Sequence, residues 1–208
     1  MKFFLLSLLV IIAACSTTKE TSEVPLPPVT VITPGTPSVP ESNSATLDKD
    51  CNQMVPANFA NTVIKHIENK PNITKQNSQK AYWIAFFKSL AKAESCLNPV
   101  SRYVEPPSLG KDAVTGKQNT SEGYFQMSYQ DSKFHGCKFD YAADKVKATS
   151  DKTKTIFDME NQIECAAIVL DKQLKSGVLM RPYYWSVLGT KNASGLAKFK
   201  KFMKAEGY

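Results

Sequence analysis

Glu94 is the residue of this sequence whose type and surroundings are best suited to proton transfer. It lies at the end of the most hydrophobic helical segment, and Ala91, Leu90 and Phe87 precede it at helical spacings. A carboxyl held against such an apolar face loses hydration, which raises its pKa because the charged form is disfavoured. General acid catalysis near neutral pH needs a carboxyl of this kind. The alternative is a solvated glutamate that happens to end a helix, and this pattern alone does not choose between the two.

Glu105 is a candidate for a second carboxylate at the same site. It lies eleven residues after Glu94, where the chain leaves the helix, so it could face a substrate cleft together with Glu94. The alternative for Glu105 is a solvated loop charge, and Glu122 is a weaker candidate. The two histidines, His66 and His135, are expected to be structural or solvated. No sequence pattern indicates a metal site or a cofactor.

The elements that must position these residues are mainly helical. Apolar residues at helical spacing predict helices over residues 56–70, 78–96 with Ser78 as the cap, 158–174, 182–188 and 193–206. Residues 99–128 lose this spacing and contain several glycines and prolines, which predicts short strands joined by a turn over 111–119. We therefore expect an α+β domain, mainly helical, with a small β wing after the helix that carries Glu94.

The amino-terminal quarter of the chain differs in composition from the rest. Residues 3–14 form an apolar run of about 18 Å as a helix, too short for a bilayer core of about 30 Å, which predicts a signal peptide over 1–14. Of residues 16–50, 18 are Pro, Ser or Thr, which predicts a disordered tether over 15–50. The folded domain is then 51–208, with 23 basic and 14 acidic residues. This excess of positive charge favours a polyanionic partner.

Apart from Cys15, the cysteines are even in number: Cys51, Cys96, Cys137 and Cys165. In an exported domain this predicts two disulfides, with three possible connectivities. A four-thiolate zinc site is the alternative, and the absence of any CxxC pair disfavours it.

Four segments, in order along the chain, resemble motifs of the soluble-lytic-transglycosylase-like (goose-type lysozyme-like) domain family. Glu94–Pro99 resembles its "E-S-x-x-N-P" segment, and Ser121–Ser128 resembles its "S-x-G-L-x-Q-x-S" segment. Asn161–Leu170 resembles "N-I-x-C-G-V-x-I-L", and Pro182–Leu188 resembles a "Y-W-S-V-L" segment of a proteobacterial branch. The resemblance implies a lysozyme-like fold and cleavage of the β-1,4 bond between N-acetylmuramic acid and N-acetylglucosamine in peptidoglycan.

The resemblance also implies residue roles. Glu94 would act as general acid and then as base, closing a 1,6-anhydro ring, as in a lytic transglycosylase; we favour this chemistry because a specific motif places only one carboxylate. Lysozyme-type hydrolysis with Glu105 as second carboxylate is the alternative. The expected substrate contacts are Ser121, Gln126, Ser128 and Tyr184; for Ser121 and Ser128 the alternative is that they only fix the wing. Tyr103 and Tyr129 are expected as sugar platforms at the cleft rim. Trp185 is expected in the core.

Two further expectations follow from resemblance. The proteobacterial branch carries cysteines at the places of Cys137 and Cys165, so we expect these two to pair, which leaves Cys51 to pair with Cys96. Ile12-Ala13-Ala14-Cys15 resembles the lipobox of bacterial lipoproteins, which implies lipidation of Cys15. Ser16, rather than an aspartate, then implies an outer-membrane anchor facing the periplasm. An ordinary signal peptide is the alternative.

The expected partners are peptidoglycan glycan strands and, through Cys15, a membrane. Export excludes nucleic acid as the partner of the basic domain, and we expect a monomer without a cofactor. The competing function is a non-catalytic lipoprotein that binds peptidoglycan.

Overall fold

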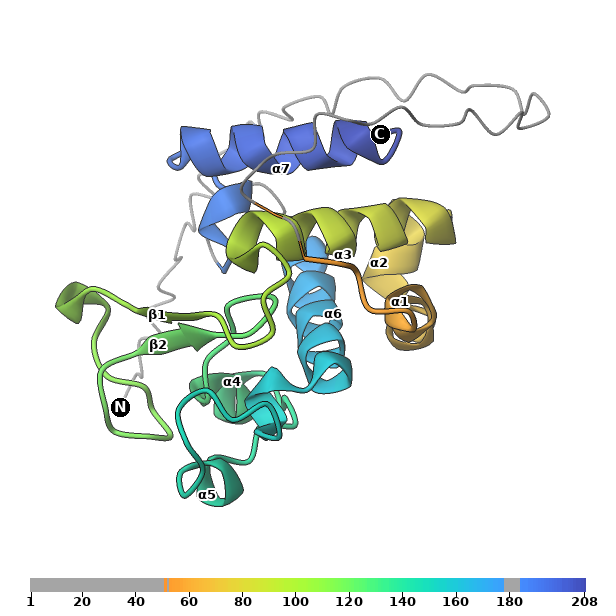
Figure 1. The fold of residues 1–208 in the computed structure, drawn as a ribbon. Coiled ribbons are helices and arrows are strands. Elements are labelled where there is room, and N and C mark those ends of the chain that lie inside the picture. Colours follow the sequence, from red (N-terminus) through yellow and green to blue (C-terminus); the bar gives the residue numbers. More distant parts are fainter. Residues whose placement is uncertain (1–50, 52, 178–183) are drawn as a thin grey trace, which may run out of the picture. The chain divides into compact units, whose positions relative to one another are not determined.

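The computed structural model describes residues 51, 53–177 and 184–208 (Figure 1). The chain divides into two units, residues 1–43 and 44–208, and every described residue belongs to the second. The predicted signal peptide (1–14), the lipidation site Cys15 and the tether (15–50) lie outside the described residues. None of the described helices has the length and apolar character needed to cross a membrane.

The described residues form a mainly helical α+β domain, as predicted. In chain order the α-helices are α1 (Phe59–Ile67), α2 (Pro71–Gln76), α3 (Lys80–Ser95), α4 (Gln130–Phe134), α5 (Tyr141–Asp144), α6 (Met159–Lys175) and α7 (Ala193–Ala205). The strands are β1 (Arg102–Val104) and β2 (Thr120–Glu122), and 3₁₀ turns occur at Pro107–Leu109, Thr155–Phe157 and Ser186–Leu188.

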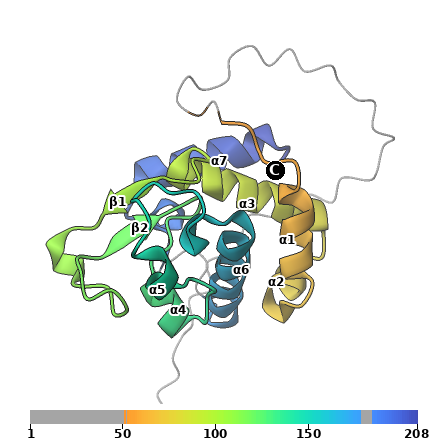
Figure 2. The same ribbon diagram turned by 60° about the horizontal axis from the view of Figure 1, so that its bottom comes forward.

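Helix α3 runs through the core, between α7 and α1 (Figures 1 and 2). The predicted apolar face of this helix is buried, with Trp83, Phe86 and Phe87 at most 3% exposed. Phe87 packs edge to face on Phe125, and Phe86 packs in the same way on Phe199 of α7. Each such side chain contributes about 1.5–3 kcal/mol on burial. The end of α3, which carries Glu94, is therefore held by the core of the domain.

Strands β1 and β2 form the predicted wing, an antiparallel pair joined by residues 105–119. Arg102 pairs with Glu122, Tyr103 with Ser121, and Val104 with Thr120. Because side chains alternate along a strand and directly paired residues share a face, Tyr103 and Ser121 lie on one face of the wing. The other two pairs lie on the opposite face. This register decides which side chains of the wing lie on each of its two faces.

Two expectations about helix ends are wrong. Helix α3 begins at Lys80 without a side-chain cap, so Ser78 does not cap it; the Oδ1 atom of Asn77 accepts the Gln79 N–H at 2.8 Å instead. The first helix ends at Ile67, and Pro71 starts a second helix, α2, at a position where a missing N–H costs nothing. Helices α2, α4 and α5 were not predicted because each is too short to show a helical period.

The later helices lie close to their predicted ranges. Asp158 caps α6 by accepting the Asn161 N–H at 2.9 Å, and Asn192 caps α7 by accepting the Gly195 N–H at 2.9 Å. Of the helix predicted over 182–188, residues 182 and 183 lie outside the described residues, and Ser186–Leu188 form a 3₁₀ turn.

Both predicted disulfides are present. Cys137 is bonded to Cys165 of α6, and Cys51 is bonded to Cys96, which directly follows α3. The second bond ties the amino end of the domain to the turn two residues after Glu94.

Candidate active site

Glu94 lies in the last turn of α3, and the chain reverses direction immediately after it. Cys96 and Leu97 adopt left-handed backbone conformations, with φ of 53° and 60°, which residues other than glycine rarely adopt. The Cys96 N–H donates to the carbonyl of Lys92 at 3.0 Å, and Leu97 is 2% exposed. The disulfide of Cys96 and the burial of Leu97 therefore fix the end of the helix next to Glu94.

The electrostatic environment of Glu94 favours its protonated form. Burial raises the pKa of Glu94 to about 7; a hydrogen bond from the Val187 backbone lowers it, and the charge of Glu105 raises it further. The Oε1 atom of Glu94 is buried without a hydrogen-bond partner. Glu94 can thus hold a proton near neutral pH, and one of its oxygens has its hydrogen-bonding capacity unused within the described part of the chain.

Glu94 faces a cavity of about 610 Å³, which we call the Glu94 cleft. Its volume is within the range of about 300–1,000 Å³ that is typical of ligand sites. The other lining residues come from the wing, the turn after β2 and the segment before α7: Ser101, Arg102, Tyr103, Glu105, Leu109, Ser121, Gln126, Tyr184, Trp185 and Ser186. The structure therefore brings most of the predicted site residues to one cleft.

Glu105 directly follows β1, on the face of the wing that borders the Glu94 cleft. Its N–H donates to the carbonyl of Asn119 at 2.9 Å, and its Oε1 atom accepts a hydrogen bond from the Ser121 hydroxyl. The Oε2 atom makes no hydrogen bond within the described part of the chain. Ser121 thus orients Glu105, a role that was not predicted for it.

The turn after β2 presents Gln126 to the cleft. Gln126 has a φ of 52°, and its Nε2 atom donates to the Gly123 carbonyl at 2.9 Å. Two backbone hydrogen bonds between Glu122 and Met127, of 2.7 and 2.9 Å, close this turn. The cleft-lining position of Gln126 is thus set by the backbone of a tight turn.

Gln162 of α6 anchors this turn and was not predicted as a site residue. It is fully buried; its Nε2 donates to the carbonyls of Glu122 and Ile156, and its Oε1 accepts the Phe125 N–H at 3.0 Å. A Cβ atom on Gly123 would lie 2.4 Å from this amide, so the position requires glycine. The sequence signal that could have identified Gln162 is its polar side chain on the otherwise apolar helix face that also carries Ala166.

Tyr184 lines the cleft, and its hydroxyl donates to the Asp131 carboxylate. Burial raises the pKa of Asp131, while hydrogen bonds from Tyr184 and Ser128 lower it. Ser128 is 5% exposed, and its N–H donates to Asp131 at 2.7 Å. The expected contact of Ser128 with substrate is therefore wrong: it orients Asp131, which in turn orients Tyr184.

Three further residues considered from the sequence lie in different surroundings. Glu122 lies on the face opposite to Glu105, buried against Arg102 with Nε to Oε1 at 3.1 Å, so it is not the second carboxylate of the cleft. Tyr129 is buried, and its hydroxyl donates to Asp144, so it is not a platform at the cleft rim. Tyr103 does line the cleft and is 57% exposed.

Trp185 is a core residue, and the two histidines lie away from the Glu94 cleft. Trp185 is 2% exposed and donates its indole N–H to the Phe125 carbonyl at 3.0 Å. His66 lies near Glu160, and His135 lies near Asp131, and neither borders the Glu94 cleft. Among residues 51, 53–177 and 184–208, no group of His, Cys, Asp and Glu side chains is arranged to hold a metal ion.

Comparisons with known proteins give a structural similarity. No protein-family model and no curated protein matches the sequence. The solved structure of Bdellovibrio Bd0314 DslA, wild-type form 2, superposes with a TM-score of 0.55 at 19% identity, over 72% of this chain and 91% of that one. A variant of DslA with one glutamate replaced by glutamine has a TM-score of 0.52 at 18% identity, over 71% and 87% of the two chains. At these identities the similarity establishes a shared, lysozyme-like fold.

Proposed function

We propose that this protein cleaves the β-1,4 bond between N-acetylmuramic acid and N-acetylglucosamine in peptidoglycan, with Glu94 as the general acid. The observation that carries the proposal is Glu94 itself: a largely buried carboxyl with a pKa of about 7 and an unpartnered oxygen, in a cleft large enough for sugar units. Protonated Glu94 gives its proton to the glycosidic oxygen as the bond breaks.

Hydrolysis is the chemistry that the placement of Glu105 favours. Ring closure needs only Glu94, first as acid and then as base. Hydrolysis also needs a second carboxylate, to activate water or to stabilise the cation-like transition state. Glu105 lines the same cleft and lies close enough for its charge to raise the pKa of Glu94. The ring-closing reaction that we expected from the sequence thus becomes the alternative.

The DslA structures support a role for both carboxylates. Two of them are variants in which one glutamate is replaced by glutamine, and the two replaced positions are eleven residues apart in that chain. Glu94 and Glu105 are separated by the same number of residues.

The test is digestion of purified peptidoglycan by the wild type, Glu94→Gln and Glu105→Gln, with mass spectrometry of the products. We expect Glu94→Gln to keep the fold and lose activity, because the amide is nearly isosteric but cannot donate the proton. Products with reducing ends, about 18 daltons heavier per terminus than anhydro ends, would support hydrolysis. Anhydro products from a fully active Glu105→Gln would establish ring closure. Binding without cleavage by the wild type would support the non-catalytic lipoprotein instead.

We also propose that the enzyme is anchored through lipid on Cys15 to the outer membrane, facing the periplasm. The lipobox-like sequence before Cys15 supports this location. Labelling cells with a fatty-acid analogue tests it: the wild type should carry the label, and Cys15→Ser should not.

A further inference from the structure

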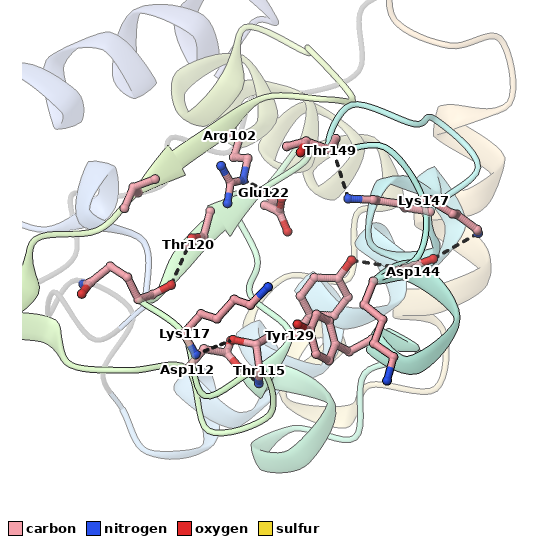
Figure 3. A pocket seen from close by; sticks show the side chains of 15 residues that line it. Arg102, Asp112, Thr115, Lys117, Thr120, Glu122, Tyr129, Asp144, Lys147 and Thr149 are labelled. Atoms are coloured by element: carbon pink, nitrogen blue, oxygen red, sulfur yellow. Dashed lines mark hydrogen bonds and ion pairs between the residues drawn. The ribbon is translucent and has the colours of Figure 1, made fainter.

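A second cavity, of about 270 Å³, lies on the other face of the wing (Figure 3). The strands contribute Arg102, Val104, Thr120 and Glu122, the residues that alternate with those facing the Glu94 cleft. The loop of the wing and the segment from Tyr129 to Lys154 complete it. We call this cavity the wing pocket. Arg102 lines both cavities, so the wing pocket and the Glu94 cleft adjoin at this side chain.

The wing pocket carries more positive than negative side chains. Its carboxylates are Asp112, Glu122 and Asp144, and its cations are Arg102, Lys117, Lys145, Lys147 and Lys154. Two of the cations are paired: the Nε of Arg102 lies 3.1 Å from Glu122, and the Nζ of Lys147 lies 3.1 Å from Asp144. The other three lysines face one remaining carboxylate, Asp112, with which none of them forms an ion pair, so the lining has an excess of two positive charges.

The contacts of these three lysines leave donors unused. Within the described part of the chain, the Nζ atoms of Lys117 and Lys145 make no hydrogen bond or ion pair. Lys154 is 8% exposed, and its Nζ donates only to the Thr149 carbonyl, at 3.1 Å. An ammonium group has three donors, and this Nζ also lies over the Phe157 ring, 5.7 Å from its centroid, so at least one donor of this buried cation remains for a bound oxyanion. In Figure 3 the Lys117 side chain extends into the space between the wing and Tyr129.

Buried aspartates hold the segments that carry these lysines. Asp112 accepts the N–H groups of Val114 and Thr115 at 2.8 Å, and its N–H donates to the Lys117 carbonyl at 2.9 Å, which fixes the turn before Lys117. Asp144, directly before Lys145, is completely buried.

Asp144 accepts hydrogen bonds from Tyr129, from Lys147 and from both the hydroxyl and the N–H of Thr155. These hydrogen bonds hold both aspartates in the wall of the pocket, and the lining as a whole has five cations against three carboxylates. The pocket is preorganised to receive negative charge, which lowers the cost of binding.

We propose that the wing pocket binds a carboxylate of a peptide carried by the glycan substrate, a proposal that rests on peptidoglycan being the substrate. The lysines supply charge-assisted donors to the carboxylate, and the hydroxyls of Thr115, Thr120 and Tyr141 are placed for the adjacent peptide groups. The volume, just below the lower limit of about 300 Å³ for ligand pockets, suits one or two amino acids rather than a sugar chain or a chain of phosphate groups. The excess of two positive charges matches the one or two carboxylates of such a peptide end.

Peptide binding can be measured apart from catalysis. Full-length Glu94→Gln is titrated calorimetrically with a synthetic stem tetrapeptide that has free carboxylates, with the same peptide fully amidated, and with glycerol phosphate. We expect the free peptide to bind, the amidated peptide to bind at least tenfold more weakly, and affinity to fall as salt screens the lysines. Equal binding of both peptides, or tighter binding of glycerol phosphate, would overturn the proposal.

Matched variants locate the site. Lys117→Gln with Lys145→Gln removes two exposed cations from the pocket, and Lys200→Gln with Lys204→Gln removes the same charge from α7. We expect the first pair to weaken peptide binding about tenfold or more, the second to leave it unchanged, and Lys117→Arg with Lys145→Arg to retain it. An equal loss of peptide affinity in the two Gln double variants would mean that the peptide is attracted by overall charge, and it would overturn the assignment of binding to the wing pocket.

Digestion by the active enzyme separates this proposal from the proposed function. With Glu94 present, the Lys117→Gln, Lys145→Gln pair should raise KM for glycan strands that carry peptides, with kcat unchanged, and leave strands stripped of peptides unaffected. An equal rise in KM on stripped strands would assign these lysines to glycan binding and overturn the proposal. If no strand is cleaved even by the wild type, the proposed function fails, while the titration still decides whether the pocket binds the peptide.

Discussion

Replacing Glu94 with glutamine should make the protein more stable at alkaline pH while removing its activity. Burial raises the pKa of Glu94 from 4.5 to about 7, so between these values the folded state holds a proton that the unfolded state has lost. Stability from this proton is present in full below about pH 4.5 and is lost as pH rises through 7. The shift corresponds to a cost on the order of 3 kcal/mol for ionised Glu94 in the fold.

A glutamine at position 94 avoids this cost because it is neutral at every pH. For a domain of this size, about 2–4 °C of Tm per kcal/mol predicts a Tm roughly 6–12 °C above that of the wild type at about pH 8.5. Near pH 4 the two proteins should unfold at nearly the same temperature, because Glu94 is then protonated in both the folded and the unfolded state.

Thermal unfolding followed by circular dichroism at both pH values tests this, with Glu68→Gln as the control. Glu68 is exposed and pairs at the surface with Lys80, so its replacement should change Tm little at either pH. A Tm difference between the wild type and Glu94→Gln that does not depend on pH would refute the argument. It would mean that Glu94 is solvated and ionises normally, and the general acid would have to be sought elsewhere.

Three other perturbations have defined outcomes. Glu105→Gln should lower the pKa of Glu94, because the Glu105 charge raises it; a carbon-13 NMR titration of Glu94 that does not move would contradict this. Gln162→Leu should cost about 2 kcal/mol or more, since it leaves the buried Phe125 N–H and Ile156 carbonyl unpaired and removes one of the two hydrogen bonds to the Glu122 carbonyl; chemical denaturation measures this. Removing the Cys51–Cys96 bond by Cys51→Ser with Cys96→Ser should cost about 4 kcal/mol for a 45-residue separation and lower muralytic activity; calorimetry with unchanged Tm would argue against this role.

The core helices were predictable because their sequence signals are long and redundant. Trp83, Phe86, Phe87 and Leu90 repeat at helical spacing over two turns, so one misjudged residue does not change the predicted face. The same pattern gave the apolar neighbours of Glu94, and the raised pKa of Glu94 follows from them. The disulfide pairs followed from resemblance, since cysteine count alone allows three connectivities.

The residues around the cleft were harder to predict because their roles depend on short segments and single turns. Ser128 and Ser121 both carry a hydroxyl near Gln126 in sequence, but Ser128 contacts buried Asp131 and Ser121 contacts Glu105. Gln162 acts through a turn whose backbone conformation only the folded structure defines. A strand of three residues shows no alternating pattern from which its faces could be assigned.

The register of the wing links the two cavities. A shift of one residue between β1 and β2 would exchange the faces of a strand, placing Glu122 at the Glu94 cleft and moving Ser121 away from Glu105. Three residue pairs alone specify a register weakly, so it must be held from outside the strands. The turn after β2 does this in two ways. Gln162 holds the carbonyl of Glu122, and a shifted strand would place a residue other than glycine beside Gln162, where there is no room for a Cβ atom. The glutamine of α6 therefore determines both which carboxylate faces Glu94 and which cations line the wing pocket.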